Sequence, residues 1–144
     1  MTRHTLSLRT VRGFTLIELL VILVILALMA GLVGPQVMRY LGESKTKTAQ
    51  VQIEELVSAM DLYRLDVGSY PSTAQGLQAL VVQPAGVERW NGPYLRRREV
   101  PVDPWGNPYL YRAPGEHSTP FDIWSYGADG RPGGEGENAD VVSW

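Results

Sequence analysis

The longest apolar run in the chain lies near its N-terminus, from Phe14 to Val33, and it contains one charged residue, Glu18. As an α-helix these 20 residues rise about 30 Å, the thickness of the hydrocarbon core of a bilayer. A carboxylate at mid-membrane costs about 2.5–3.5 kcal/mol, and less nearer the edge. The run predicts a membrane-spanning helix, in which Glu18 either has a functional role or reaches the head groups.

A second apolar pattern begins beyond Pro35, where apolar residues recur three and four positions apart. This spacing gives a helix one apolar face, so we expect one helix from about Phe14 to Val67, kinked at Pro35 and ended by Gly68. The face is that of a domain core rather than a binding groove. Its members are Ile53, Leu56, Val57, Met60, Tyr63 and Val67.

Short elements are expected in the rest of the chain. Ser72 and Gln75 have the spacing of a capping box, which predicts a second helix near 73–82. Short runs of apolar and aromatic residues predict strands at 109–111, 121–125 and near 140–143. Because the strands follow one another closely, we expect an antiparallel sheet. The fold class is therefore α+β, a long N-terminal helix packed on a small sheet.

Residues 1–13 carry Arg3, Arg9 and Arg12 and no acidic residue. Positive charge ahead of an apolar run keeps that end in the cytoplasm, so the C-terminal part is expected on the other side of the membrane. An ordinary secretory signal is cut after its apolar run at a small-x-small site. Ala27, Ala30 and Gly31 are poorly spaced for such a site, which argues against that kind of signal.

Composition limits the remaining functions. A chain of 144 residues has room for one small domain beside the membrane segment. Its net charge of −2 does not favour nucleic-acid binding, which needs a basic surface. No cysteine is present, so core packing or a metal must stabilise the domain. The basic run from Arg96 to Arg98 is either a solvated loop or a contact with acidic surfaces of neighbouring subunits.

The segment 125–140 mixes carboxylates with glycines. Ca²⁺ takes about six to eight oxygen ligands, backbone carbonyls among them, and glycines let a loop wrap around the ion. The spacing is not that of an EF-hand, and composition alone supports a flexible acidic tail equally well. The apolar residues Val141, Val142 and Trp144 that follow favour an ordered loop, because they would return to the core.

Two other functional classes compete with a structural role. The sequence offers few candidate catalytic residues for an enzyme. Its histidines are His4 and His117, and no nucleophile or phosphate-loop motif is present. Asp122 and Asp129 could serve a glycosidase, although so small a domain leaves little room for a cleft. A membrane-tethered binding module would need an exposed aromatic patch. The four tryptophans could form one, but we expect Trp105 and Trp124 in the core.

The segment from Arg12 to Glu18, Arg-Gly-Phe-Thr-Leu-Ile-Glu, resembles the class III leader of the type IV pilin superfamily. The resemblance implies that a prepilin peptidase cuts between Gly13 and Phe14 and methylates the new amino group of Phe14. Glu18 would then pair with the Phe14 amino group of an adjacent subunit during assembly. Without the leader, the mature side chains carry 10 basic and 15 acidic residues, a net charge of −5.

Three further motifs resemble the major pseudopilin family of the type II secretion system, and the resemblance covers nearly the whole chain. It implies a pilin-like fold with a leader at 1–13, a transmembrane and filament-core helix at 14–35 and a periplasmic globular domain at 36–144. The motifs are Tyr-Pro-Ser-Thr-Ala-Gln-Gly-Leu-Gln-Ala-Leu at 70–80, Asp-Pro-Trp-Gly-Asn-Pro-Tyr at 103–109, and Phe-Asp-Ile-Trp-Ser-Tyr-Gly-Ala-Asp-Gly at 121–130 with Ala-Asp-Val-Val-Ser-Trp at 139–144.

The function implied by this resemblance is mechanical rather than enzymatic. Subunits would wait as single-pass proteins in a bacterial inner membrane and then assemble into a helical periplasmic filament, the pseudopilus, that drives export of folded proteins across the outer membrane. Implied partners are further copies, minor pseudopilins, the inner-membrane assembly platform and the prepilin peptidase. A type IV pilin or a minor pseudopilin is the alternative, followed by a membrane-tethered binding module or a hydrolase.

The same resemblance implies a structural Ca²⁺ in the C-terminal loop. Its ligands would be the side chains of Asp129, Asp140 and Asn138 and the backbone carbonyls of Tyr126 and Arg131.

Overall fold

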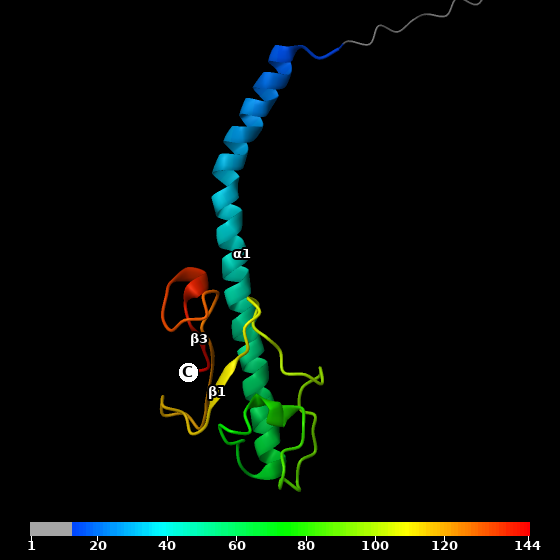
Figure 1. Cartoon of the computed structure of the whole chain (residues 1–144), viewed down its shortest axis with the longest axis vertical. Helices are drawn as coiled ribbons and strands as arrows, with labels where there is room; N and C mark the ends of the chain where they lie inside the picture. The colour runs from blue at the N-terminus through cyan, green and yellow to red at the C-terminus, as the bar shows by residue number, and fades with distance from the viewer. Residues whose placement is uncertain (1–12) are drawn as a thin grey trace, which may run out of the picture. The chain divides into compact units, whose positions relative to one another are not determined.

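The computed structural model describes residues 13–144, so the expectations for Arg3, Arg9 and Arg12 lie outside the described residues. The chain divides into two compact units between Met38 and Arg39. The elements, drawn in Figure 1, are α1 (Leu16–Val67), η1 (Leu77–Leu80), β1 (Leu110–Arg112), β2 (Asp122–Ser125), η2 (Gly136–Asn138) and β3 (Val141–Val142), where η marks a 3₁₀ helix.

Helix α1 has defined caps at both ends. Its first turn is capped by the Thr15 hydroxyl, which accepts a 3.3 Å hydrogen bond from the Glu18 N–H. At the other end Gly68 adopts φ +95°, and its N–H donates a 2.7 Å hydrogen bond to the Arg64 carbonyl. The predicted single helix and its end at Gly68 are confirmed. The helix continues through Pro35, and the kink there stays a prediction.

In the first unit, the apolar side chains of α1 are all exposed. Those from Leu16 to Met38 have exposed fractions between 44% and 91%. By length and composition, this part of the helix is suited to cross a membrane. Nothing within residues 13–144 of a single copy covers it, so another phase or another molecule must do so.

The second unit has one hydrophobic core, built on the C-terminal half of α1. The predicted apolar face is confirmed, because Ile53, Leu56, Met60 and Tyr63 are at most 1% exposed. Burying a side chain of this size stabilises the fold by about 1.5–3 kcal/mol. The core is completed from the rest of the chain by Leu77, Ala79, Leu80, Tyr109, Phe121, Ile123 and Val141.

The three strands form an antiparallel sheet in the order β1-β2-β3, which confirms the α+β class. Ile123 is fully buried in the core, whereas Trp124 is half-buried because successive strand residues face opposite sides of a sheet. The expectation that Trp124 lies in the core is therefore wrong. Trp105 packs against the core, as expected.

The second helix predicted near 73–82 does not form. The capping box is present, since the Ser72 N–H donates to Gln75 Oε1 at 2.8 Å and the Gln75 N–H donates to Ser72 Oγ at 3.3 Å. However, Gly76 adopts φ +60°, outside the right-handed helical region. The segment is therefore a turn followed by η1.

Candidate functional site

The predicted cleavage position lies just ahead of α1. Gly13 and Phe14 are outside the helix, and the Phe14 side chain is 75% exposed. Non-helical, exposed backbone is the kind of segment that a peptidase can accept. Glu18 is exposed in the first turn of α1, and its pairing with the Phe14 amino group of another copy stays a prediction.

The loop between β2 and β3, residues 126–140, closes on itself through its backbone. The Ala128 N–H donates a 2.8 Å hydrogen bond to the Glu137 carbonyl. Gly127, at φ +67°, lies close to the other side of the loop. A Cβ at this position would be 2.6 Å from the Glu137 carbonyl oxygen. The two halves of the loop can pack this tightly only because position 127 has no side chain.

Asp129 and Asp140, two of the predicted calcium ligands, each accept a hydrogen bond from the backbone of this loop. The Asp129 carboxylate accepts a 3.1 Å hydrogen bond from the Arg131 N–H. Both carboxylate oxygens of Asp140 lie 3.0 Å from the Gly133 N–H. Asp129 and Asp140 are both exposed, so their oxygens are accessible from solvent.

Asn138 and Tyr126, two further predicted ligands, make other contacts. Asn138 belongs to η2, where its N–H donates a 3.1 Å hydrogen bond to the Glu135 carbonyl. The Tyr126 ring packs edge-on against Trp124, with ring centroids 6.2 Å apart. Among residues 13–144, no three His, Cys, Asp or Glu side chains gather as a metal cluster. The available donors are all oxygens, which suits a hard cation such as Ca²⁺, but backbone carbonyls and water would have to supply several ligands.

The start of the loop is anchored by Asp103, a residue that the sequence analysis did not single out. Its carboxylate is only 3% exposed and accepts hydrogen bonds from the N–H groups of Trp105 at 3.0 Å and Asn107 at 2.8 Å. The Ser125 hydroxyl donates a hydrogen bond to this carboxylate and accepts one of 3.1 Å from the Gly127 N–H, which links Asp103 to the start of the loop. An Asp side chain that accepts hydrogen bonds from N–H groups two and four residues later is typical of a turn. The sequence Asp-Pro-Trp-Gly-Asn at 103–107 could therefore have predicted this turn.

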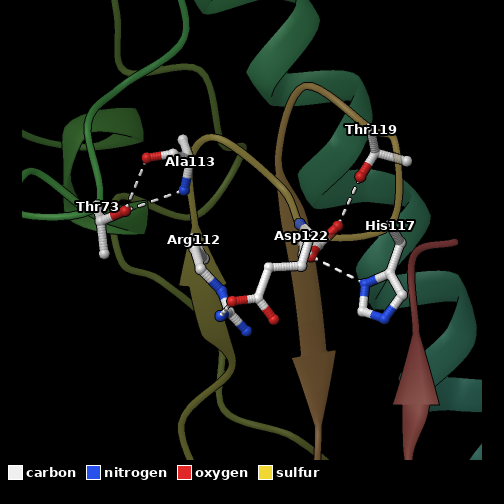
Figure 2. A network of polar contacts seen from close by, with 7 residues as sticks. Thr73, Arg112, Ala113, His117, Thr119 and Asp122 are labelled. Carbon is white, nitrogen blue, oxygen red and sulfur yellow. Dashed lines mark hydrogen bonds and ion pairs between the residues drawn. The ribbon is translucent and has the colours of Figure 1, made fainter.

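A second buried carboxylate, Asp122, lies on β2 at the centre of the polar network in Figure 2. It is fully buried and accepts hydrogen bonds from the Thr119 hydroxyl at 2.5 Å and the Glu116 N–H at 2.8 Å. His117 Nδ1 lies 3.0 Å from Asp122 Oδ2, the oxygen that also accepts from the Glu116 N–H. Burial raises the pKa of Asp122, but these hydrogen bonds outweigh burial and hold the pKa below its usual value.

This geometry bears on the glycosidase hypothesis. Asp122 is enclosed by hydrogen-bond donors, whereas Asp129 is exposed on the loop between β2 and β3. A glycosidase needs both carboxylates facing one cleft, at a separation set by its mechanism. The arrangement therefore gives no support to Asp122 and Asp129 as a catalytic pair.

The end of the loop is anchored by the last residues of the chain. The Ser143 N–H donates a 3.0 Å hydrogen bond to the Ile123 carbonyl, and the Ile123 N–H donates one of 3.0 Å to the Ser143 hydroxyl. The Trp144 ring stacks on His117 with centroids 3.8 Å apart and planes 6° from parallel. His117 is exposed overall, but one face of its ring is covered by Trp144.

Comparison with known families accounts for both parts of the chain. The family described as "Type II secretion system (T2SS), protein G" matches residues 36–144, and the "Prokaryotic N-terminal methylation motif" matches residues 8–34. The chain belongs to the type II secretion system protein G family. The range matched by the methylation motif includes Gly13, Phe14 and Glu18, and cleavage between Gly13 and Phe14 stays a prediction.

Relatives of this family cover almost the whole chain. Type II secretion system core protein G of Pseudomonas aeruginosa is 49% identical over 136 residues, which are 92% of this chain and 94% of that protein. The Vibrio cholerae protein of the same name is 42% identical over 141 residues, 96% of this chain and 94% of its own length.

A solved structure supports the same assignment. The chain is similar to the crystal structure of the major pseudopilin from the type 2 secretion system of enterohaemorrhagic Escherichia coli, with a TM-score of 0.62 and 36% identity. The match covers 74% of this chain and 92% of that one. The resemblance to the major pseudopilins and the pilin-like fold are thus confirmed.

Proposed function

We propose that this chain is the major structural subunit of a type II secretion pseudopilus. The precursor is inserted in the inner membrane of a bacterium with its globular domain in the periplasm. A prepilin peptidase removes residues 1–13 and methylates Phe14. Copies then assemble into a filament that drives export of folded proteins across the outer membrane.

The observation that carries this proposal is the exposed apolar half of α1. Its large apolar side chains from Leu16 to Met38 are at least 44% exposed in a single copy. Soluble monomers rarely expose contiguous apolar patches larger than a few hundred Å², so a continuous apolar helix needs lipid or other helices around it. Membrane lipid covers it before assembly, and the same segments of neighbouring copies cover it inside the filament.

The partners follow from this cycle. Extraction of a subunit from the bilayer requires an inner-membrane assembly platform, and minor pseudopilins of related fold accompany the filament. Both named relatives carry the protein G designation, which favours the major subunit over a type IV pilin or a minor pseudopilin. The role is structural rather than catalytic, in keeping with a family of filament subunits.

The C-terminal loop completes the proposal as a calcium site. Asp129, Asp140 and Asn138 would hold a structural Ca²⁺ with their side-chain oxygens, and Tyr126 and Arg131 with their backbone carbonyls. The exposed carboxylates of Asp129 and Asp140, which bond to backbone N–H groups only two residues apart, support this set. Bound Ca²⁺ would offset the repulsion between the two carboxylates and fix the loop against the sheet.

The test is reconstitution of filament growth. The full chain is expressed with a prepilin peptidase and an assembly platform, and sheared fibres are examined by electron microscopy. We expect fibres whose subunits begin at Phe14. A matched chain in which a cleavable secretory signal replaces residues 1–35 should be exported yet form none. Membrane-bound, correctly processed subunits that never form fibres would refute the filament role and favour a membrane-tethered binding module.

A further inference from the structure

The first buried residue of α1 is Gly42. Every residue of α1 before it is exposed or, at Gly34, half-buried, and the next buried residue along the helix is Ala49. Ala49 is also where the hydrophobic core begins. Gly42 therefore lies seven positions ahead of the core, about two helical turns or roughly 10 Å along the axis. Something other than the core must bury it.

The cover of Gly42 is the side chain of Glu137. A Cβ built at position 42 would lie 2.5 Å from Glu137 Cγ and 2.8 Å from its Cδ. Contacts this short do not occur between real atoms, so the Glu137 side chain occupies the space that any other residue at position 42 would fill. Glu137 belongs to η2, in the loop between β2 and β3. Figure 1 shows this loop, orange to red, beside α1.

Glu137 is held in this place from its own side. Its carbonyl accepts the hydrogen bond from the Ala128 N–H, and the backbone of Gly127 packs against it. The loop backbone is thus fixed where it presents the side chain to the helix. Residues 39–48 carry Arg39, Lys45 and Lys47 against a single acid, Glu43, so the local charge of the helix also favours a carboxylate there.

We propose that Gly42 is the seat of the C-terminal loop on α1, and that the Glu137 side chain in this seat holds the helix segment 42–48 to the globular domain. Gly42 is the only buried residue of this segment, and Thr46 is half-buried. With Glu137 packed on Gly42, the C-terminal loop extends the packed part of the globular domain about two turns along α1. The inference goes beyond the proposed function, because it needs neither a filament nor a metal.

The test is hydrogen exchange on the full chain as a monomer in detergent micelles, with millimolar Ca²⁺ in every sample. Glu137→Ala removes the side chain from the seat, and we expect the amides of residues 43–48 to exchange about tenfold faster. The matched control is Glu135→Ala, an exposed acid of the same loop, which should leave these amides unchanged. Equal exchange in the two variants would overturn the proposal.

A second pair of variants separates the seat from helix propensity. Alanine is the better helix former, so Gly42→Ala should slow exchange unless its methyl group displaces Glu137. We expect faster exchange at 43–48 in Gly42→Ala, and no such effect in Gly31→Ala, where a Cβ would meet no atom within 4 Å.

Combining the two changes tests direct contact. Once Glu137 is truncated, the methyl group at position 42 has nothing to displace. The double variant Gly42→Ala with Glu137→Ala should therefore exchange no faster than Glu137→Ala alone. Independent, additive effects of the two substitutions would contradict the seat. Because the readout uses monomers, such a failure would leave the filament proposal untouched.

Discussion

The Ser125 hydroxyl donates a 2.5 Å hydrogen bond to the carboxylate of Asp103, and both residues are buried. The bond joins the turn at 103–107 to the end of β2, where the C-terminal loop begins. A second link runs beside it, a 3.2 Å hydrogen bond from the Asn107 side-chain amide to the Gly127 carbonyl. The proposed calcium loop is therefore positioned by polar contacts as well as by the core.

Loss of this contact should weaken the domain. Ser125→Ala leaves one oxygen of Asp103 and the Gly127 N–H without their partner, and a buried unsatisfied group costs about 1–3 kcal/mol. We expect a lower urea midpoint with an unchanged slope. Ser58→Ala, which removes an exposed hydroxyl from α1, is the control and should change stability by no more than about 0.5 kcal/mol. Equal midpoints for the two variants would show that the contact contributes nothing.

Acid should destabilise the domain through Asp122. Since its pKa is lower in the folded chain than its usual value, its contribution is present above the unfolded pKa, about 3.9, and is lost as pH falls through the folded pKa. Asp122→Asn should lower the melting temperature at pH 7 and flatten its fall below about pH 4. Melting curves from pH 2 to 7 would check this, with Glu55→Gln as an exposed control. An unchanged acid limb in Asp122→Asn would contradict the assignment.

Processing should depend on Gly13. A bulky residue there, as in Gly13→Leu, should leave uncut precursor in the membrane, whereas Gly31→Leu in the apolar run should be processed normally. Immunoblotting would separate precursor from mature chain, and N-terminal sequencing of the mature chain should begin at Phe14. A mature chain that starts elsewhere would disprove the cleavage site.

Glu18 should govern assembly rather than insertion. Removing one partner of an ion pair in an apolar setting costs about 3–5 kcal/mol, so Glu18→Ala should be cleaved and inserted but form few or no fibres. Since Glu18 also lies in the first turn of α1, Glu18→Gln offers a control that keeps its shape without its charge. We expect Glu18→Gln to fail as well, as counted by electron microscopy. Normal fibres from either variant would leave Glu18 as a residue that only reaches the membrane interface.

Calcium should stabilise the globular domain. An ion that binds only the folded chain adds about 2.7 kcal/mol at a hundredfold excess over its Kd. Chelation of the full chain in micelles should lower its melting temperature, and Ca²⁺ should restore it more fully than Mg²⁺, whose octahedral demand is stricter. Asp129→Ala or Asp140→Ala should abolish the difference, and Glu135→Ala should matter less. Identical melting curves with chelator and with millimolar Ca²⁺ would favour a flexible acidic loop.

Local patterns predicted the fold well where one signal dominated. The apolar face of α1 and its end at Gly68 follow from helical spacing and from a glycine that can adopt positive φ. The helix expected near 73–82 does not form, because Gly76 adopts a positive φ that interrupts the helix favoured by the capping box. In β2 the alternation of residues defines two faces of the strand but does not show which face packs on the core. The expectation that Trp124 lies in the core was therefore wrong.

The candidate site was predictable only in part, for a related reason. Asp129 and Asp140 lie on either side of one glycine-rich loop, so composition could bring them together. Asp103 meets Ser125, and Gly42 meets Glu137, across long stretches of chain. No local periodicity encodes such contacts. Only the folded backbone shows that a glycine inside a helix is needed for close packing.

The stack of Trp144 on His117 also limits how this protein can be handled in the laboratory. An affinity tag or fluorescent protein fused after Trp144 would begin at a packed ring, two residues beyond β3, which follows the C-terminal loop. The exposed bend at residues 96–99 belongs to no helix or strand and is the better place for an inserted epitope.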